Sequence, residues 1–325
     1  MPVARAIVAL NGGPPDRPVL VALRALGLGD LLVAVPALRA IGDGFPDHRL
    51  VFAGPRALEP LLRLIDPRWH QVPCAPFDFG CRPPLRPEVA VNLHGSGPQS
   101  HALLDSLRPR RLIAYAHPRE PRWAAGPAWD PCEHEVRRWC RLLEEHGIPA
   151  DERDLDIVVP EVEVGEDPPT VLHPGAADPA RRWPARRWAA VARAEECSGR
   201  RVVLTAGPGE RELAVRIAFD AGLEPRSAVR SGMTLDALAA QIAAAGRVAS
   251  ADTGVAHLAV ALGRPSVVVF GPGDPGRWGP PPDRPGHLLV QSPGHREHAF
   301  DVPVDAVVGA LAALAAAGAL ARAAG

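Results

Sequence analysis

Apolar runs of strand length alternate with helix-like segments along most of the chain, and this alternation limits the fold more than any other feature. Runs that are apolar throughout are typical of parallel strands covered by helices on both faces. The sequence therefore predicts an α/β fold of two Rossmann-like domains facing across a cleft, with ligands outside the carboxyl ends of the strands. The predicted strands are 19–23, 50–53, 89–93, 171–173, 202–205, 248–250 and 266–270, and the predicted helices are 30–41, 134–146, 183–197, 210–221, 235–245 and 255–262.

The length of 325 residues is enough for two domains with separate cores. A stretch rich in Pro, Glu and Gly separates the two sets of predicted strands and is typical of a linker. Residues 4–10 can form a short strand, so the first residues are either a flexible arm or an edge strand. The predicted parts are an N-terminal extension at 1–17, an N-terminal domain at 18–160, a linker at 161–168, a C-terminal domain at 169–303 and a C-terminal helix at 304–325.

Composition excludes several classes of function. The formal net charge is −1, so the whole chain carries no electrostatic footprint for nucleic acid. All 36 basic residues are Arg, so a phosphate-binding side chain must be Arg and no lysine can act as a base. The five cysteines form no C-x-x-C pair and match no standard metal site. With no signal peptide and no apolar stretch long enough to cross a membrane, the sequence predicts a cytoplasmic protein.

The sequence A-D-T-G-V-A-H at residues 251–257 predicts a helix that begins at a potential anion site. Thr253 and Gly254 lie where the helix starts, so their N–H groups lack partners within the helix and carry the positive end of its dipole. A diphosphate binds well at such a place. Asp252 can accept a hydrogen bond from a sugar hydroxyl. The alternative is that the Asp-Thr pair only caps a core helix.

A second candidate is Asp30, which follows the glycines of L-G-L-G-D at the end of a predicted strand. This places one carboxylate at the carboxyl edge of the sheet, where it can act as a general base on an acceptor hydroxyl. The glycines permit close approach of a ligand to the backbone. As an alternative, Asp30 is only the N-cap of the next helix.

Two further strand-to-helix turns carry charged side chains. The first turn contains H-P-G-A at 173–176 and R-R-W-P at 181–184. Each of its two arginines can donate two parallel hydrogen bonds to phosphate oxygens. The second turn, T-A-G-P-G-E, ends at Glu210, which can bond the hydroxyls of a ribose. Alternatively, Glu210 lies in the first turn of a helix and interacts only with its dipole.

The order of these motifs resembles glycosyltransferase family 9, whose best-known members are the ADP-heptose:lipopolysaccharide heptosyltransferases. The resemblance covers nearly the whole chain from Val19 onward. The matching motifs are G-L-G-D at 27–30, N-L-H-G-S at 92–96, H-E-V-R-R-W at 134–139, the two motifs within 173–184, D-T-G-V-A-H at 252–257 and G-P-G-D-P-G-R-W-G-P at 271–280.

The resemblance implies a GT-B fold and an inverting, metal-independent transfer of a sugar from a nucleoside-diphosphate sugar, with no cofactor. Asp30 falls on the family's proposed base, and Arg181 falls near its phosphate-binding Lys. Glu210 falls near a ribose-binding Glu, and Met233 lies in a loop like the one that contacts the nucleobase. The donor-site motif is matched by Asp252, Thr253, Gly254 and His257.

The implied donor is a nucleotide sugar, with an ADP-sugar favoured and heptose or a related sugar transferred. Two departures from the family affect the donor site: Arg replaces Lys at 181, and Ala176 and Ala177 fall where some members carry hydroxyl groups. The implied acceptor is a glycan, a lipid-linked or small molecule, bound by the N-terminal domain. The acceptor-side candidates are Asn92, His94, Ser96, Arg119 and Arg122.

Several alternatives stay open. Arg119 and Arg122 belong to the basic stretch at residues 107–123, which has five arginines and one acidic residue, Glu120. This stretch is either a solvated loop or a lining of the cleft that favours an anionic acceptor. A sugar-nucleotide epimerase of the same fold and a non-catalytic nucleotide-sugar-binding protein are competing functions. An NAD-dependent oxidoreductase is disfavoured because the G-x-G-x-x-G fingerprint is absent. No transmembrane segment is predicted, while peripheral membrane contact stays possible.

Overall fold

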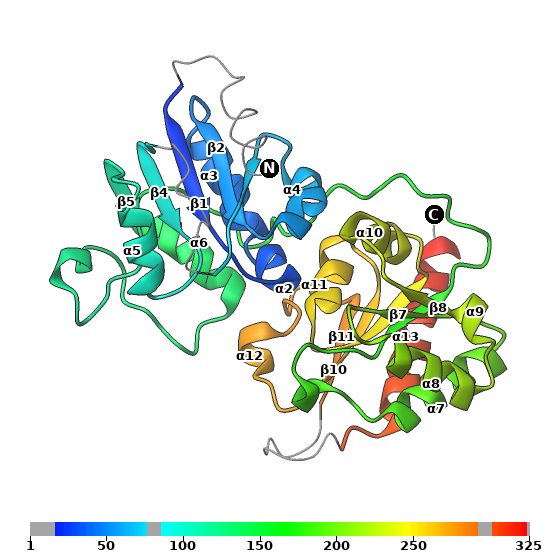
Figure 1. Cartoon of the computed structure of the whole chain (residues 1–325). Coiled ribbons are helices and arrows are strands. Elements are labelled where there is room, and N and C mark those ends of the chain that lie inside the picture. The colour runs from blue at the N-terminus through cyan, green and yellow to red at the C-terminus, as the bar shows by residue number, and fades with distance from the viewer. Residues whose placement is uncertain (1–16, 77–85, 292–300, 324–325) are drawn as a thin grey trace. The chain divides into compact units, whose positions relative to one another are not determined.

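The computed structural model describes residues 17–76, 86–291 and 301–323, and of the predicted N-terminal extension only Arg17 lies within these ranges. The chain divides into two compact units, Met1–Ile157 and Val158–Gly325 (Figure 1). Residues 161–168, predicted as a linker, contain neither helix nor strand.

Unit 1 is built on a parallel sheet whose described strands run in the order β3-β2-β1-β4-β5 (Figure 1). The order reverses between β1 and β4, where Leu23 pairs with Asn92 at the carboxyl ends of the two strands. In a doubly wound sheet this reversal opens a crevice for ligands. The strands are β1 (Val19–Leu23), β2 (Arg49–Gly54), β3 (His70–Pro73), β4 (Val89–Asn92) and β5 (Arg111–Ile113).

Helices cover both faces of this sheet. On one face, α5 packs through Leu104 against Val21 and Leu23 of β1 and Ala53 of β2. On the other side, α3 packs against α6. The described helices are α2 (Leu28–Leu32), α3 (Val35–Gly44), α4 (Glu59–Ile65), α5 (Gln99–Asp105) and α6 (Glu135–Glu145), with 3₁₀ turns η1 (Arg56–Leu58) and η2 (Pro121–Trp123).

The sequence predicted one helix over 30–41, and the structure divides it into α2 and α3. Pro36 is the reason, because a proline has no N–H to donate and its ring clashes with the carbonyl four residues earlier. It is instead accommodated in the first turn of α3, where no N–H partner is required. This correction moves the start of the first helix to Leu28, ahead of Asp30.

Unit 2 repeats the same architecture. Its described strands run in the order β11-β10-β9-β6-β7-β8, all parallel, and the order reverses between β6 and β9 (Figure 1). His173 pairs with Ser250 at the carboxyl ends of these two strands. The strands are β6 (Thr170–His173), β7 (Val202–Ala206), β8 (Val229–Ser231), β9 (Arg247–Ala251), β10 (Ser266–Phe270) and β11 (His287–Gln291).

One face of the unit 2 sheet packs against α7, α8 and the C-terminal helix α13, with Trp183 and Trp188 buried in that core. The other face packs on α11 through Ala256, Val268 and Phe270. The predicted C-terminal helix thus lies on the body of its unit. The described helices are α7 (Ala185–Cys197), α8 (Arg211–Ala221), α9 (Pro225–Ala228), α10 (Leu235–Ala243), α11 (Gly254–Ala261), α12 (Pro275–Trp278) and α13 (Val304–Ala323), with the 3₁₀ turn η3 (Pro179–Arg181).

Candidate functional site

Most of the predicted site residues follow the strands at the two points where the strand order reverses, whereas Glu210 follows β7, Met233 follows β8, and Arg119 and Arg122 follow β5. In unit 1, Asp30 follows β1 and His94 follows β4, so the two loops leave neighbouring strands. In unit 2, the H-P-G-A loop follows β6 and the D-T-G motif follows β9. Ligands of open α/β sheets bind at such reversals. The sheet topology therefore gives both groups of residues a place suited to binding.

Asp30 lies in the first turn of α2, three residues after the N-cap, and not at the N-cap itself. Gly27 is the N-cap, and its N–H donates to Asp30 Oδ2 at 3.2 Å. This bond explains part of the sequence pattern, because a carboxylate at the third helical position satisfies an N-terminal N–H group. The side chain is 28% exposed, so it caps the helix and still reaches solvent.

Arg24, which was not among the predicted site residues, lies immediately after β1 and faces Asp30. Its Nη2 is 3.4 Å from Asp30 Oδ1, and its side chain is 1% exposed. The signal was present, because an arginine directly after an apolar strand needs a partner when it is buried. The same loop places His94 beside this pair, since the N–H of Ala25 donates to His94 Nδ1 at 3.2 Å.

The loop after β4 is held together by Asn92. Its amide donates to Ser100 Oγ at 2.9 Å, and its Oδ1 accepts the His94 N–H at 3.0 Å. Asn92 is fully buried, so its side chain maintains the shape of the loop, in which His94 is also buried and Ser96 is half-buried. Burial and the charge of Arg24 lower the pKa of His94, while Asp30 opposes that shift.

In the structure, carboxylates partly neutralise the charge of the basic stretch of unit 1. Arg122 lies 3.6 Å from Glu120 and 3.9 Å from Asp105, and its guanidinium stacks on Trp123. Asp105 belongs to α5, so its contribution was not apparent from the basic stretch alone. Arg119 is exposed, and its backbone N–H donates to His117 Nδ1 at 3.4 Å.

In unit 2 the D-T-G motif has the local structure that the sequence predicts. Thr253 is the N-cap of α11, and its hydroxyl oxygen accepts the N–H of Val255 at 3.4 Å. Gly254 is the first helical residue, where a backbone N–H has no acceptor within the helix. Asp252 precedes them and is buried. Burial raises the pKa of its carboxyl group, and the nearby Arg181 guanidinium opposes that increase.

Two arginines from the loop after β6 meet two buried carboxylates. Arg181 Nη1 lies 3.6 Å from Asp252 Oδ2, and Arg182 Nη2 lies 3.6 Å from Glu210 Oε1. Glu210 Oε2 also accepts the N–H of Gly207 at 2.9 Å. Glu210 is the N-cap of α8 and fills the space beside Gly175, where an added Cβ would come within 2.0 Å of it. The sequence predicts that Arg182, like Arg181, can bind phosphate, whereas its contact with Glu210 was not predicted.

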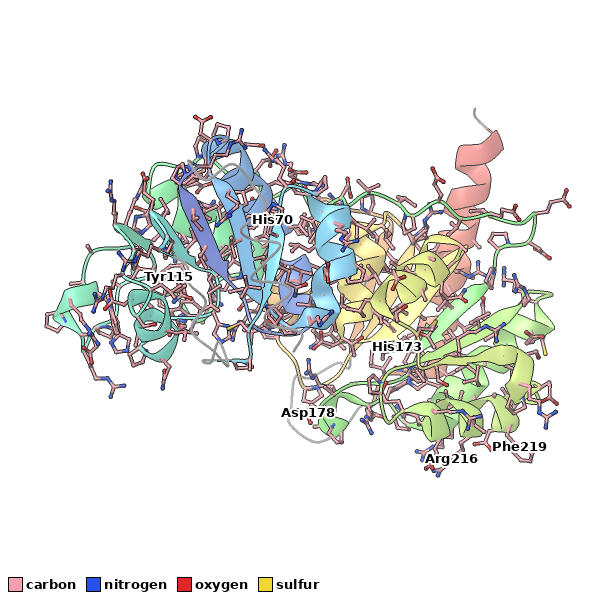
Figure 2. The ribbon with its side chains drawn as sticks, turned by 45° about the horizontal axis from the view of Figure 1, so that its top comes forward. His70, Tyr115, His173, Asp178, Arg216 and Phe219 are labelled. Atoms are coloured by element: carbon pink, nitrogen blue, oxygen red, sulfur yellow. The ribbon has the colours of Figure 1, made fainter. Side chains whose placement is uncertain are left out.

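Three other residues of unit 2 are not part of these two arginine–carboxylate pairs: His173, His257 and Met233. His173, labelled in Figure 2, is buried. Its Nδ1 lies 2.9 Å from Thr205 Oγ1. Burial lowers the pKa of His173 to about 4, so its ring is neutral near pH 7. His257 packs edge-on against Trp278, the last residue of α12. Met233 is half-buried in the loop between β8 and α10.

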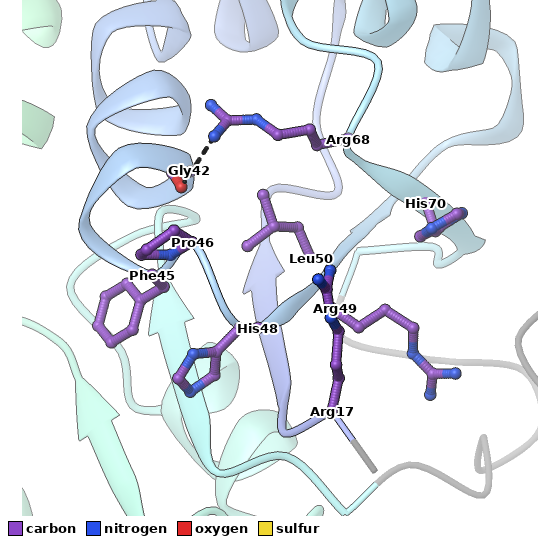
Figure 3. Close-up of a pocket in the computed structure, with 9 residues that line it drawn as sticks. All are labelled: Arg17, Gly42, Phe45, Pro46, His48, Arg49, Leu50, Arg68 and His70. Carbon is purple, nitrogen blue, oxygen red and sulfur yellow. Dashed lines mark hydrogen bonds between the residues drawn. The ribbon is translucent and has the colours of Figure 1, made fainter. Parts of the chain in front are cut away.

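A cavity of about 250 Å³ lies elsewhere in unit 1, at the amino ends of β2 and β3 (Figure 3). Arg49 and His70, the first residues of these strands, line it together with Arg68. Arg68 is already engaged, since it pairs with Asp66 at 2.7 Å and Asp43 at 2.8 Å. This cavity is at the opposite edge of the sheet from Asp30, so it is not the candidate site.

Within the described ranges, no group of three or more His, Cys, Asp or Glu side chains is arranged to hold a metal ion. None of the helices in those ranges is both long and apolar enough to span a membrane.

Comparison with known proteins identifies relatives of the chain. The family model described as glycosyltransferase family 9 (heptosyltransferase) matches residues 128–300, more than half of the sequence. Lipopolysaccharide heptosyltransferase 1 of Escherichia coli is 42% identical over 83 residues, which are 25% of this chain and 25% of that protein. The match thus spans about a quarter of the length of this curated relative.

Solved structures resemble the chain over most of its length. A glycosyltransferase family 9 protein from Veillonella parvula covers 92% of this chain and 97% of its own, with a TM-score of 0.76 and 18% identity. Heptosyltransferase WaaC of E. coli with ADP covers 91% and 99%, with a TM-score of 0.71 and 21% identity. At these identities the likeness establishes the fold, and the predicted GT-B class is confirmed.

Proposed function

Because the chain belongs to glycosyltransferase family 9, we propose that it transfers a sugar from a nucleoside-diphosphate sugar to an acceptor hydroxyl, with inversion and without a metal ion. One observation carries the proposal. Each of the two sheets places groups of the required chemistry where its strand order reverses: a carboxylate at Asp30 in unit 1, and an arginine with a helix N-terminus at Arg181 and Gly254 in unit 2.

In the proposed reaction Asp30 accepts the proton of the acceptor hydroxyl. The acceptor oxygen forms a bond to the anomeric carbon as the bond from that carbon to the diphosphate oxygen breaks. A single displacement of this kind inverts the anomeric carbon and requires one base. The nucleoside diphosphate leaves with the electron pair of the broken bond, and its new negative charge must be stabilised.

Arg181 and the N-terminus of α11 are suited to that stabilisation. A guanidinium can donate two parallel hydrogen bonds to phosphate oxygens. The N–H of Gly254 carries the positive end of the helix dipole. We assign Asp252, Thr253 and His257 to the same donor site, with Glu210 and Met233 toward the nucleoside. The donor is proposed to be an ADP-sugar, since a structural relative is described with ADP.

The acceptor is proposed to bind to unit 1, near Asp30, and to be a glycan or another glycoconjugate. His94 and Ser96 lie in the loop after β4, whose shape Asn92 maintains. Arg119 leaves more of its charge available to an anionic acceptor than Arg122, which Glu120 and Asp105 partly neutralise. We also propose that the protein acts in the cytoplasm and makes peripheral contact with the membrane when its acceptor is membrane-bound.

The test is the substitution Asp30→Asn, assayed with a panel of nucleotide sugars and with anionic and neutral acceptors. An asparagine keeps an oxygen for the Gly27 N–H, so the start of α2 is preserved while the base is lost. We expect nucleotide affinity to stay unchanged and turnover to fall roughly 10²–10⁴-fold, the range for a lost general base. Turnover should persist in excess chelator if no metal takes part.

A matched control is Asp43→Asn in the same unit, which removes an exposed carboxylate paired with Arg68. It should leave turnover unchanged. Near-normal turnover in Asp30→Asn would reduce Asp30 to a residue that stabilises the helix. Interconversion of nucleotide sugars with no acceptor present would support an epimerase instead, and donor binding without any turnover would support a non-catalytic protein.

A further inference from the structure

Arg24 joins the two loops that leave the sheet of unit 1 at its reversal point. Its Nε donates to the backbone oxygen of Asp30, and its Nη1 donates to the backbone oxygen of Leu93. Its Nη2 lies 3.4 Å from Asp30 Oδ1. One guanidinium therefore connects the end of β1, the first turn of α2 and the end of β4.

The surroundings of Arg24 leave its side chain little freedom. The guanidinium lies over the ring of Trp139 on α6, 4.6 Å from its centroid. The backbone of Arg24 is held as well: its N–H donates to the backbone oxygen of Ala53 in β2 at 3.0 Å. Its own backbone oxygen lies so near Gly54 that a Cβ there would come within 2.9 Å of it. A planar side chain that is stacked on one face and bonded along its edge keeps one orientation.

The buried charges around Arg24 point to Asp30 as its counter-ion. Burial lowers the pKa of Arg24, and the charges of Asp30 and Glu135 oppose that shift. Glu135 is bonded by Arg138, and both of these side chains are almost fully buried. Asp30 is therefore the carboxylate that balances Arg24, and a buried guanidinium without a partner is unfavourable.

We propose that Arg24 is a positioning residue that fixes the Asp30 carboxylate for proton transfer. With Oδ1 beside Arg24 and Oδ2 bonded to the Gly27 N–H, the carboxylate is oriented by one contact on each oxygen. A carboxylate has about four acceptor positions, so others stay available on the exposed part of the group. The inference rests on the proposed role of Asp30 as the base.

The experiment combines substitution, chemical rescue and a double-mutant cycle in the full chain. Arg24→Ala should lower kcat at least tenfold and leave the affinity for ADP unchanged, because the proposed donor residues belong to unit 2. Guanidinium ion at millimolar concentration should restore part of that kcat. Arg247→Ala is the matched control, since Arg247 is a buried arginine paired with Glu195 in unit 2, and guanidinium should not raise its kcat.

The double variant tests whether Arg24 acts through Asp30. Adding Arg24→Ala to Asp30→Asn should lower the residual rate by less than about twofold, because coupled residues are not additive. Arg24→Lys keeps a charge but cannot reach all three acceptors with one ammonium, so we expect an intermediate kcat. That variant also decides the question if Arg24→Ala does not fold.

Wild-type kcat in a folded Arg24→Ala or Arg24→Lys variant would overturn the inference. An additive loss in the double variant, or no rescue by guanidinium, would leave Arg24 as a structural residue only. These outcomes differ from failure of the proposed function, which appears as normal turnover in Asp30→Asn whatever happens at Arg24.

Discussion

Removal of the Arg181 side chain should weaken the binding of a nucleoside diphosphate by a moderate and calculable amount. A hydrogen bond to a charged group contributes about 1.5–3 kcal/mol. In the unbound protein the guanidinium is 39% exposed and lies 3.6 Å from Asp252, and a pair of this kind contributes up to about 1 kcal/mol. Binding a phosphate has to compete with that pair. The net loss for Arg181→Ala is therefore about 0.5–3 kcal/mol, or roughly 2- to 160-fold in Kd.

Isothermal titration calorimetry with ADP measures this change directly. Arg216→Ala is the matched control, because Arg216 is exposed on α8 and belongs to no proposed site (Figure 2). The affinity should fall in the Arg181 variant and remain at the wild-type value in the control. An Arg181 variant with unchanged Kd would refute the assignment and transfer the phosphate contact to Arg182 or to the backbone alone. Equal losses in both variants would indicate a general effect of net charge.

Two predictions concern stability. His173 has a pKa of about 4 in the folded chain against an ordinary value of 6.5, so only the unfolded state gains its proton as pH falls from about 6.5 toward 4. Stability is lost over that window, about 2 kcal/mol by pH 5, and urea denaturation of His173→Asn should lack this part of the pH dependence. Glu195→Gln should lower the free energy of unfolding by about 3–5 kcal/mol, because Arg247 is left buried without its carboxylate. A loss under about 1 kcal/mol in the same urea denaturation would argue against a buried ion pair.

The interior strands were predictable from the sequence, whereas the edge strands were not. All seven predicted strands correspond to interior strands of the two sheets, such as β1 and β10, whose residues are buried on both faces. The strands that sequence analysis missed are the sheet edges β3, β5, β8 and β11. Of these, β3, β5 and β8 are short and partly polar, so they lack the continuous apolar run that marks an interior strand. The strand β11 is as long as β10 but has polar residues at both ends and is only partly buried.

The candidate site was predictable in its local parts and not in its pairings. The cap at Thr253 and the turn before Asp30 follow from residue types at adjacent positions. The contact of Arg181 with Asp252 joins residues 71 positions apart, and it depends on β6 and β9 being neighbours. Neighbouring strands are a property of the sheet order, which a single sequence does not specify. Arg24 was missed although its partner is close in sequence, because its burial depends on β4 and α6 as well.

The two units use the same pairing of arginine and carboxylate in opposite ways. In unit 1, Arg24 is 1% exposed and bonded to two backbone oxygens, so it is fixed and belongs to the framework that holds Asp30. In unit 2, Arg181 is 39% exposed and lies at 3.6 Å from its carboxylate, which leaves the guanidinium able to turn toward a phosphate. A base must be held at one distance from the proton that it accepts, whereas a group that binds and releases a diphosphate must exchange one partner for another. The difference in burial between these two arginines fits the roles proposed for them, in which Arg24 positions a base and Arg181 binds a leaving group.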